Sequence, residues 1–477
     1  MTSSAQQYST HQSSSAIATQ FNNRQYQHLQ NLIARYTQQT KNSKAQAQAY
    51  RHVLADNRAT AGLNAITKEM HYPIVGKSSQ GSKIWDVDDN EYIDFTMGFG
   101  VNLLGHQPPL MIQAIQQQLE KGIQLGPQAE YVGEVAELIA ELTGMERVAF
   151  SNTGTEAVMT GLRLARATTG RSKIALFAGS YHGHFDGTLV KNQTANENLK
   201  AVPRTIGIPD EFVKDVLVLE YDDPQSLDAI KAYGSELAAV LVEPIQTQRP
   251  QLQPRSFLHQ LRELTQSLGI ALIFDEMVTG FRLHPGGAQA WFDVQADLAT
   301  YGKIVGGGMP IGVIAGNATY LDRIDGGMWH YGDASLPQVK TTFFAGTYCK
   351  HSLAIAAAQA MLQYLKAQGP SLQNQLNQRT EQFVKALNQC FQAEKLPVQM
   401  ANFGSFFGPI ATENYAASNA SNIPLELLRY HLLYRGILLR GSSGFLSTAH
   451  SDKDLNNTIK AIKASVAELR KDHFLPK

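Results

Sequence analysis

The stretch VAFSNTGTEAVMTGLRLAR, residues 148–166, joins three kinds of local structure in one short run. It begins with apolar residues typical of a buried strand, passes through small hydroxyl-bearing residues and a glycine, and ends in an amphipathic helical pattern. The first turn of such a helix carries free N–H groups and the positive end of the helix dipole, which together favour an anion. Thr153, Gly154 and Thr155 are therefore predicted to bind a phosphate, although the same residues would also serve as an ordinary helix N-cap.

Further apolar runs continue this pattern along the chain. They are KIALFA (173–178), VLVLEY (216–221), AAVLVEP (238–244) and ALIFDE (271–276). Strands that are buried on both faces and alternate with helices are typical of a mostly parallel α/β sheet flanked by helices. Beyond residue 350, long helical patterns with a few strand-like pieces predict a smaller α+β domain, and SKIWDVDDNEYIDF (82–95) predicts a hairpin.

Domain boundaries follow from the same patterns. Residues 1–45 are rich in Gln, Ser, Thr and Asn and are predicted to form a polar linker or tail, or a weakly formed helix, outside the core. Residues 46–100 are expected to contribute to the small domain and to the active site. Residues 101–345 are expected to form the large domain and residues 346–477 the small C-terminal domain.

Composition restricts the classes of partner. The chain has 477 residues with 41 basic and 41 acidic side chains, so no excess of charge favours nucleic acid or an anionic membrane. No apolar run is long enough to cross a bilayer, and MTSSAQQYSTHQSSSAIATQ at the N-terminus lacks the apolar centre of a secretory signal. The two cysteines cannot form a disulfide framework. We therefore expect a cytoplasmic protein without a nucleic-acid or membrane partner.

Two charged residues stand at the edge of the predicted sheet. Asp275 closes the run ALIFD at the carboxyl end of a strand, where α/β sheets place functional groups. The Mg²⁺-binding strand of nucleotide hydrolases has a similar pattern, but the GxxxxGK[ST] loop of those proteins is absent from the sequence. Lys303 precedes a glycine run in YGKIVGGGMPIG (301–312). This run is either an exposed turn or a backbone folded closely around a ligand beside an amine nucleophile.

A phosphate site, a carboxylate and a glycine-flanked lysine are together what pyridoxal 5′-phosphate (PLP) requires. Lys303 would form the Schiff base, and Asp275 would keep the ring nitrogen protonated so that the ring can act as an electron sink. Tyr181, in GSYHGHFDG (179–187), offers a ring to stack on the cofactor. His182 and His184 could instead suggest a metal, but no cysteine or acidic residue at a suitable spacing completes a site. We expect PLP and no metal.

The order of these motifs resembles that of the class III, fold type I aminotransferases, from about residue 50 to residue 470. The similarity rests on WDVDDNEYIDF, SNTGTEA, YHGH, VEP, FDEMVTGFR, GKIVGGGMPIG, AGTY and STAH. Within that family the chain is most similar to the glutamate-1-semialdehyde aminomutase branch. RYTQQTKNSK, LADNRATAG and the run 130–189 also resemble aminotransferase domains of hybrid polyketide and nonribosomal peptide synthases.

The resemblance implies the roles given above for the lysine, the aspartate, the phosphate residues and the tyrosine, and it adds others. Glu243 in VEP would lie near the cofactor. Thr347 in AGTY would reach the phosphate of the neighbouring subunit, which implies a homodimer with shared active sites. Arg58 falls near the place where the aminomutase branch has an arginine for a substrate carboxylate. Independently of the resemblance, Arg440 could contact the carboxylate of an amino donor or could be a surface charge at a strand end.

One departure from the family pattern concerns the second half of the reaction. The aminomutases carry a glutamate a few residues before STAH that gates this step, whereas RGSSGFLSTAH (440–450) has Ser442 at that place. We therefore expect transfer of an amino group from glutamate to a β-ketoacyl thioester on an acyl carrier protein. The alternatives are glutamate-1-semialdehyde 2,1-aminomutase and a non-catalytic PLP-binding interaction domain.

Overall fold

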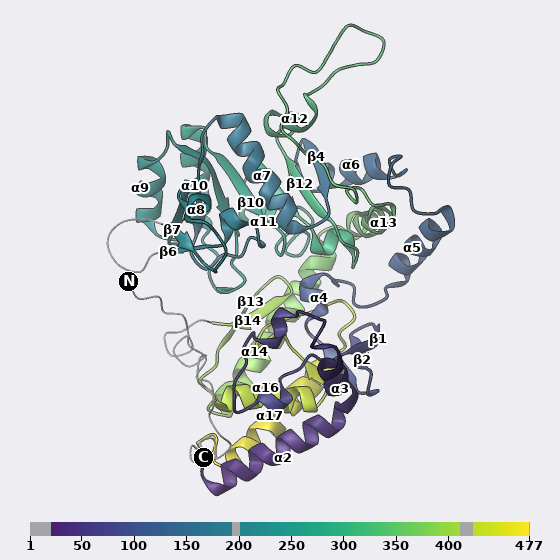
Figure 1. Cartoon of the computed structure of the whole chain (residues 1–477), viewed down its shortest axis with the longest axis vertical. Helices are drawn as coiled ribbons and strands as arrows, with labels where there is room; N and C mark the ends of the chain where they lie inside the picture. Colours follow the sequence, from purple (N-terminus) through teal and green to yellow (C-terminus); the bar gives the residue numbers. More distant parts are fainter. Residues whose placement is uncertain (1–20, 193–200, 411–422, 477) are drawn as a thin grey trace.

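A mixed sheet of seven strands, in the upper part of Figure 1, organises the large domain of the computed structural model, which describes residues 21–192, 201–410 and 423–476. Its strand order is β4-β12-β11-β10-β9-β5-β8. The strands are β4 (Arg147–Ser151), β5 (Lys173–Phe177), β8 (Val216–Leu219), β9 (Leu237–Val242), β10 (Ala271–Asp275), β11 (Leu298–Tyr301) and β12 (Gly312–Gly316). Four neighbouring pairs are parallel, and β12 runs antiparallel to both β4 and β11. All the apolar runs predicted as strands lie in this sheet, so the predicted α/β fold is confirmed.

Successive residues of the central strands point to opposite faces of the sheet, and each face has its own apolar layer. In β10, Ala271 and Ile273 pack in the cluster that includes α7 (Gly154–Thr169). Leu272 and Phe274 pack in the other cluster, with α10 (Arg255–Leu268). Burial on both faces explains why these strands have continuous apolar sequences.

The other helices of the large domain surround this sheet and connect its strands. They are α4 (Met97–Gly100), α5 (Pro109–Lys121), α6 (Val132–Thr143), α8 (Asp210–Val213), α9 (Pro224–Ala232), α11 (Gly287–Phe292), α12 (Ala318–Asp325) and α13 (Ser352–Gln368). A two-stranded ribbon is formed by β6 (Val190–Asn192) and β7 (Ala201–Pro203). In the described ranges, no helix combines the length and the apolar character that a membrane crossing requires.

The small domain, below the large sheet in Figure 1, contains two short sheets and three long helices. One sheet has the order β1-β2-β3-β15 and the other the order β13-β14-β16. Their strands are β1 (Gly76–Gln80), β2 (Lys83–Asp86), β3 (Glu91–Asp94), β13 (Met400–Phe403), β14 (Phe406–Pro409), β15 (Ile437–Leu438) and β16 (Gly444–Phe445), and the helices are α14 (Ser371–Ala393), α16 (Ile423–Tyr434) and α17 (Asp452–Lys471). The predicted hairpin is the antiparallel pair β2–β3.

The N-terminal residues correct one prediction. Residues 1–20 lie outside the described part of the chain, but α2 (Asn23–Gln39) and α3 (Lys41–Tyr50) occupy most of the rest of the segment that was predicted to be a linker or tail outside the core. Leu29, Leu32 and Tyr36 of α2 are buried and join the main apolar cluster. Their spacing forms a narrow apolar stripe in an otherwise Gln-rich helix, and a polar average conceals such a stripe.

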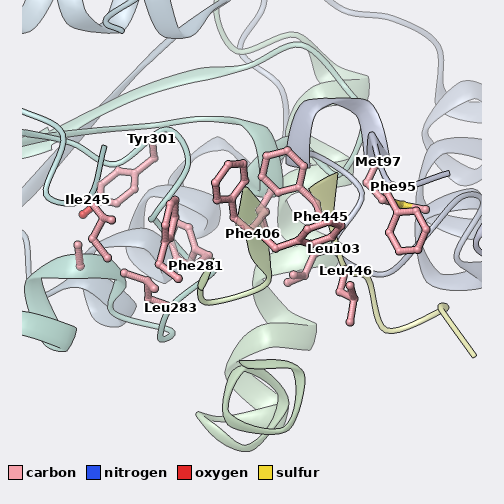
Figure 2. Close-up of a cluster of buried hydrophobic side chains, with 14 of the residues drawn as sticks. Phe95, Met97, Leu103, Ile245, Phe281, Leu283, Tyr301, Phe406, Phe445 and Leu446 are labelled. Atoms are coloured by element: carbon pink, nitrogen blue, oxygen red, sulfur yellow. The ribbon is translucent and has the colours of Figure 1, made fainter. Parts of the chain in front are cut away.

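An apolar seam joins the two domains. Figure 2 shows Phe281 and Tyr301 of the large domain on one side and Phe406 and Phe445 of the small domain on the other. The rings of Phe281 and Tyr301 are 5.4 Å apart, and those of Phe406 and Phe445 are 5.0 Å apart. Because Phe406 and Phe445 also line the cavity described next, the seam fixes one of its walls.

Candidate active site

A cavity of about 920 Å³ lies where the carboxyl ends of the large-sheet strands face the small domain. The chain brings eight of the ten residues predicted from the sequence to this one cavity: Thr153, Gly154, Thr155, Tyr181, Glu243, Asp275, Lys303 and Arg440. They come from separate parts of the chain, and strand ends that meet at one edge of a sheet place them together.

The predicted phosphate site is the N-terminus of α7. Thr153 is the N-cap residue, and its hydroxyl accepts a hydrogen bond from the Glu156 amide at 3.2 Å. Thr153 therefore both caps the helix and lines the cavity. Because Thr153, Gly154 and Thr155 line the cavity, the first amides of α7 and the dipole of this 16-residue helix would favour an anion there.

Asp275 ends β10 and is buried, with 4% of its surface exposed. One carboxylate oxygen lies 2.7 Å from His182 Nδ1, and the other accepts from the Met277 amide at 3.1 Å and from the Thr300 hydroxyl at 3.3 Å. Nε2 of His182 is buried and has no hydrogen-bond partner among the described residues. A carboxylate held by these donors is preorganised to face a cation in the cavity.

His182 is a site residue that sequence reasoning missed, because the two histidines of the YHGH motif were considered only as metal ligands. The described residues contain no group of His, Cys, Asp and Glu side chains that could hold a metal. The signal that could have found its role is its position next to Tyr181, one residue along the same loop at the strand ends. Its contact with Asp275 depends on the tertiary structure.

Lys303 follows β11 and begins the short 3₁₀ helix η4 (Lys303–Gly306) with a positive φ of 41°. Burial lowers the pKa of its ammonium group, and Asp275 acts in the opposite direction. The glycine-rich stretch after it folds closely on the phosphate turn. A Cβ at Gly312 would lie 2.2 Å from the Thr153 carbonyl oxygen. The stretch thus brings two backbones close together beside the half-buried Lys303, while Gly308 and Pro310 remain exposed.

Glu243 is a second buried carboxylate of the cavity. It accepts a hydrogen bond from the Tyr181 amide at 3.0 Å. Burial raises its pKa to about 7, to which the Asp275 charge also contributes, while His182 lowers it. Glu243 therefore can hold or release a proton near neutral pH. The side chain of Tyr181 is exposed at the cavity rim.

Arg440 brings an unpaired positive charge to the small-domain side of the cavity. Its guanidinium lies over the Phe99 ring, 4.9 Å from the ring centre, and no carboxylate within the described ranges forms an ion pair with it. Ser442 and Ser443 line the cavity beside it. This arrangement leaves Arg440 available to a negatively charged group in the cavity.

Two predicted residues lie elsewhere in the single chain. Arg58 lines a separate cavity of about 720 Å³ formed by residues 44–75, and its guanidinium pairs with Asp56 at 2.7 Å. The predicted contact of Arg58 with a substrate beside Lys303 is therefore absent within one chain. Thr347 is exposed and lines none of the cavities described here.

Comparisons with known proteins agree with this geometry. A family model described as aminotransferase class-III matches residues 65–443. The chain belongs to the class III aminotransferases. It is 35% identical over 408 residues to the glutamate-1-semialdehyde 2,1-aminomutase of Aquifex aeolicus, covering 83% of this chain and 93% of that one. It is 37% identical over 407 residues to the enzyme of the same name from Alkaliphilus oremlandii, covering 83% and 91%.

Solved structures of this family share the fold. An omega-transaminase from Sphaerobacter thermophilus aligns with a TM-score of 0.79 and 28% identity over 90% of this chain and 98% of that one. A β-phenylalanine aminotransferase from Variovorax paradoxus aligns with a TM-score of 0.78 and 27% identity over 93% and 98%. A transaminase with PLP bound aligns with a TM-score of 0.78 and 27% identity over 90% and 98%.

The cofactor of this class III enzyme is PLP, as predicted, and the residues present fit it. The N-terminus of α7 would hold the phosphate, Asp275 would hold the proton on the ring nitrogen, and Lys303 would hold the aldehyde carbon. When bound, PLP supplies an electron sink that stabilises a carbanion next to a substrate amine. With its amine free, Lys303 would serve as the base that moves a proton.

The predicted acceptor is wrong. Relatives of 35–37% identity that align over more than four-fifths of this chain are named glutamate-1-semialdehyde 2,1-aminomutase, which was the alternative, and not enzymes that act on a carrier-bound β-ketoacyl thioester. The prediction rested on the resemblance of RYTQQTKNSK, LADNRATAG and the run 130–189 to synthase domains and on Ser442 in place of a glutamate. These features do not identify the acceptor.

Proposed function

We propose that this class III aminotransferase acts as a glutamate-1-semialdehyde 2,1-aminomutase, converting glutamate-1-semialdehyde into 5-aminolevulinate. The observation that carries the proposal is the similarity to aminomutases over more than four-fifths of the chain. The cavity suits such a substrate, because it offers a cation for one carboxylate and two buried acids beside an amine.

Each cavity residue has a task in this reaction. Lys303 Nζ removes a proton from the substrate carbon that bears the amine and returns it at the neighbouring position. Asp275 is held in place by contacts with His182 Nδ1, the Met277 amide and the Thr300 hydroxyl, so that its carboxylate would face the ring nitrogen of PLP. Glu243, with a pKa raised to about 7 by burial, can exchange a proton with the substrate at neutral pH.

Arg440 is the residue we assign to the substrate carboxylate. Its only ring contact in the described part of the chain is Phe99, and a carboxylate would replace this weak contact with a charge-assisted hydrogen bond. Replacing Arg440 by Met should raise KM for the carboxylate substrate by about 10- to 100-fold, equivalent to about 1.4–3 kcal/mol. Turnover at saturating substrate should change less, and an unchanged KM would remove Arg440 from the site.

The active form we propose is a homodimer with shared sites. Thr347 is exposed in one chain, and it lies beside a loop whose large apolar side chains are also exposed, among them Trp329, Tyr331, Phe343 and Tyr348. A second copy of the chain would cover these side chains and bring Thr347 to the partner's phosphate site. Thr347→Val should then weaken PLP binding measurably, although the residue does not line the cavity of its own chain.

A second candidate is transamination between two separate molecules, with glutamate as the donor. The observation that favours it is Ser442, which lines the cavity at the position where the sequence pattern of aminomutases has a gating glutamate. An aminomutase has to retain its substrate between the two halves of the reaction. Without the carboxylate, the molecule formed in the first half of the reaction could leave the cavity. A different molecule could then enter and accept the amino group.

Product analysis separates the two candidates. The purified protein with PLP is incubated with glutamate-1-semialdehyde alone, and the formation of 5-aminolevulinate is measured. If the aminomutase proposal holds, the turnover number should be about 1 s⁻¹ or higher. Incubation with glutamate alone should release one equivalent of 2-oxoglutarate per site if the protein is a transaminase. Lys303→Ala is the control for both. Conversion of the semialdehyde at a rate no higher than in this variant contradicts the aminomutase assignment.

A further inference from the structure

Arg282 lies in the loop that follows β10, and only 1% of its surface is exposed. Its guanidinium donates to three neutral oxygens: to the Val278 carbonyl at 2.9 Å, to the Ser405 hydroxyl at 2.7 Å and to the Gly100 carbonyl. Its flat face lies on the Phe445 ring, with 4.7 Å between Cζ and the ring centre. Arg282 thus contacts four residues from three distant parts of the chain.

These partners all belong to the wall of the catalytic cavity. Val278 and Phe445 line it directly. Gly100 directly follows a phenylalanine that lines the cavity, and Ser405 directly precedes another. Figure 2 shows the rings of this wall between the large sheet and the small-domain strands. One side chain therefore ties the loop of the catalytic aspartate to the turn at residues 97–100 and to both inner strands of the small domain.

The backbone makes room for this side chain. A Cβ at Gly100, where φ is +91°, would lie 2.8 Å from Arg282 Nη2 and 2.6 Å from the Phe445 ring. A Cβ at Gly404, where φ is +51°, would lie 3.2 Å from Arg282 Cγ. Two glycines on separate segments both face the same arginine. Each also has a backbone conformation that other residues rarely adopt.

The charge of Arg282 has no counter-charge. Among the described residues no carboxylate pairs with it, and burial alone lowers its pKa, to about 9, so it stays charged at neutral pH. A buried charge without a charged partner lowers stability. Burial is the main cause of the lowered pKa of Lys303. Asp275 and Glu243 oppose this shift, and the positive charges of Arg282 and Arg440 add to it.

We propose that Arg282 is a positioning residue of the amine-transfer site. It holds three segments of the cavity wall together through neutral contacts, and its uncompensated positive charge lies behind the wall of the cavity that Lys303 lines, where it disfavours a second positive charge. Neutral partners are essential to this role, because a carboxylate partner would cancel the field that Arg282 exerts in the cavity.

The test measures the ionisation of Lys303 without any substrate. The full-length protein, freed of PLP, is exposed briefly to acetic anhydride across a pH series, and acetylation of Lys303 is measured by peptide mass spectrometry. An exposed lysine in the same digest, Lys385, is the internal standard. In Arg282→Met we expect the pH of half-maximal labelling to rise by about one unit, a ~10-fold fall in the free-amine fraction. The result does not depend on which reaction the protein catalyses.

Two further variants separate charge from packing. Ser405→Ala removes one hydrogen-bond acceptor of the Arg282 guanidinium and leaves its charge. The melting temperature should therefore fall, while the pH of half-maximal labelling of Lys303 should not change. Arg282→Lys keeps the charge but cannot make the same contacts, so it should restore most of the labelling shift. An unshifted profile in Arg282→Met, or an equal shift in Ser405→Ala, overturns the proposal. If Arg282→Met does not fold, a shift of about one unit in Arg282→Lys overturns it equally.

Discussion

Replacing Asp275 by Asn tests the central charge of the site with little change of shape. The carboxylate accepts hydrogen bonds from His182 Nδ1, the Met277 amide and the Thr300 hydroxyl. An amide has one accepting oxygen and one donating nitrogen. At least one of these three donors would then face another donor, which costs about 1–3 kcal/mol of stability at a buried site.

The larger effect is on catalysis, because Asn cannot hold a proton on the ring nitrogen of PLP. Two opposite unit charges about 3 Å apart interact by roughly 5 kcal/mol at an effective dielectric constant of about 20. Loss of about 4 kcal/mol of this stabilisation from the barrier lowers turnover on the order of 10³-fold. PLP binding should weaken much less, because the N-terminus of α7 and Lys303 remain.

Turnover is measured at saturating substrate, and PLP affinity is measured separately by fluorescence titration. A matched control is Glu276→Gln, which makes the same chemical change at the next residue. Glu276 is buried, but its carboxylate accepts from the Ala288 and Gln289 amides and does not line the cavity. Turnover of Asp275→Asn within tenfold of the unaltered protein would refute the assigned role, as would an equal loss in the control.

Three further predictions concern the covalent site, pH and the N-terminal helix. Borohydride reduction of the protein with PLP should fix the cofactor to the peptide containing Lys303, and mass-spectrometric detection on any other lysine would contradict the site. Burial raises the pKa of Glu276 to about 7 from 4.5, so the folded protein favours the protonated carboxyl. The stabilisation from this carboxyl is fully present below pH 4.5 and is lost as the pH rises through 7. Compared with Glu276→Gln, the protein should lose up to about 3 kcal/mol of unfolding free energy across this interval, measured by denaturant titration, and parallel curves would refute this. Leu32→Ala, at a fully buried position of α2, should cost about 3 kcal/mol and increase hydrogen exchange in α2 first; an unchanged unfolding midpoint would mean that α2 does not belong to the core.

Sequence patterns were sufficient for the features that depend on local order. Apolar runs predicted the strands of the large sheet, and residues directly after them, such as Asp275 and Thr153, were predicted to be functional because strand ends meet at one edge. The same patterns failed for α2, where Leu29, Leu32 and Tyr36 are too few to raise the apolar average of a Gln-rich segment. Local reasoning therefore succeeds for continuous apolar runs and for the broad apolar face of α7, and it fails for the few apolar residues of a Gln-rich helix such as α2.

The partners of each side chain were decided only by the tertiary structure. The contact of His182 with Asp275, the contacts of Arg282 with Gly100 and Ser405, and the distance of Arg58 from Lys303 have no counterpart in any local pattern. The periodicity of apolar residues reports which face of a helix or strand is buried, and it does not report what that face packs against. Contacts between segments that lie a hundred residues or more apart depend instead on how whole elements pack, and this is set by the summed fit of many side chains.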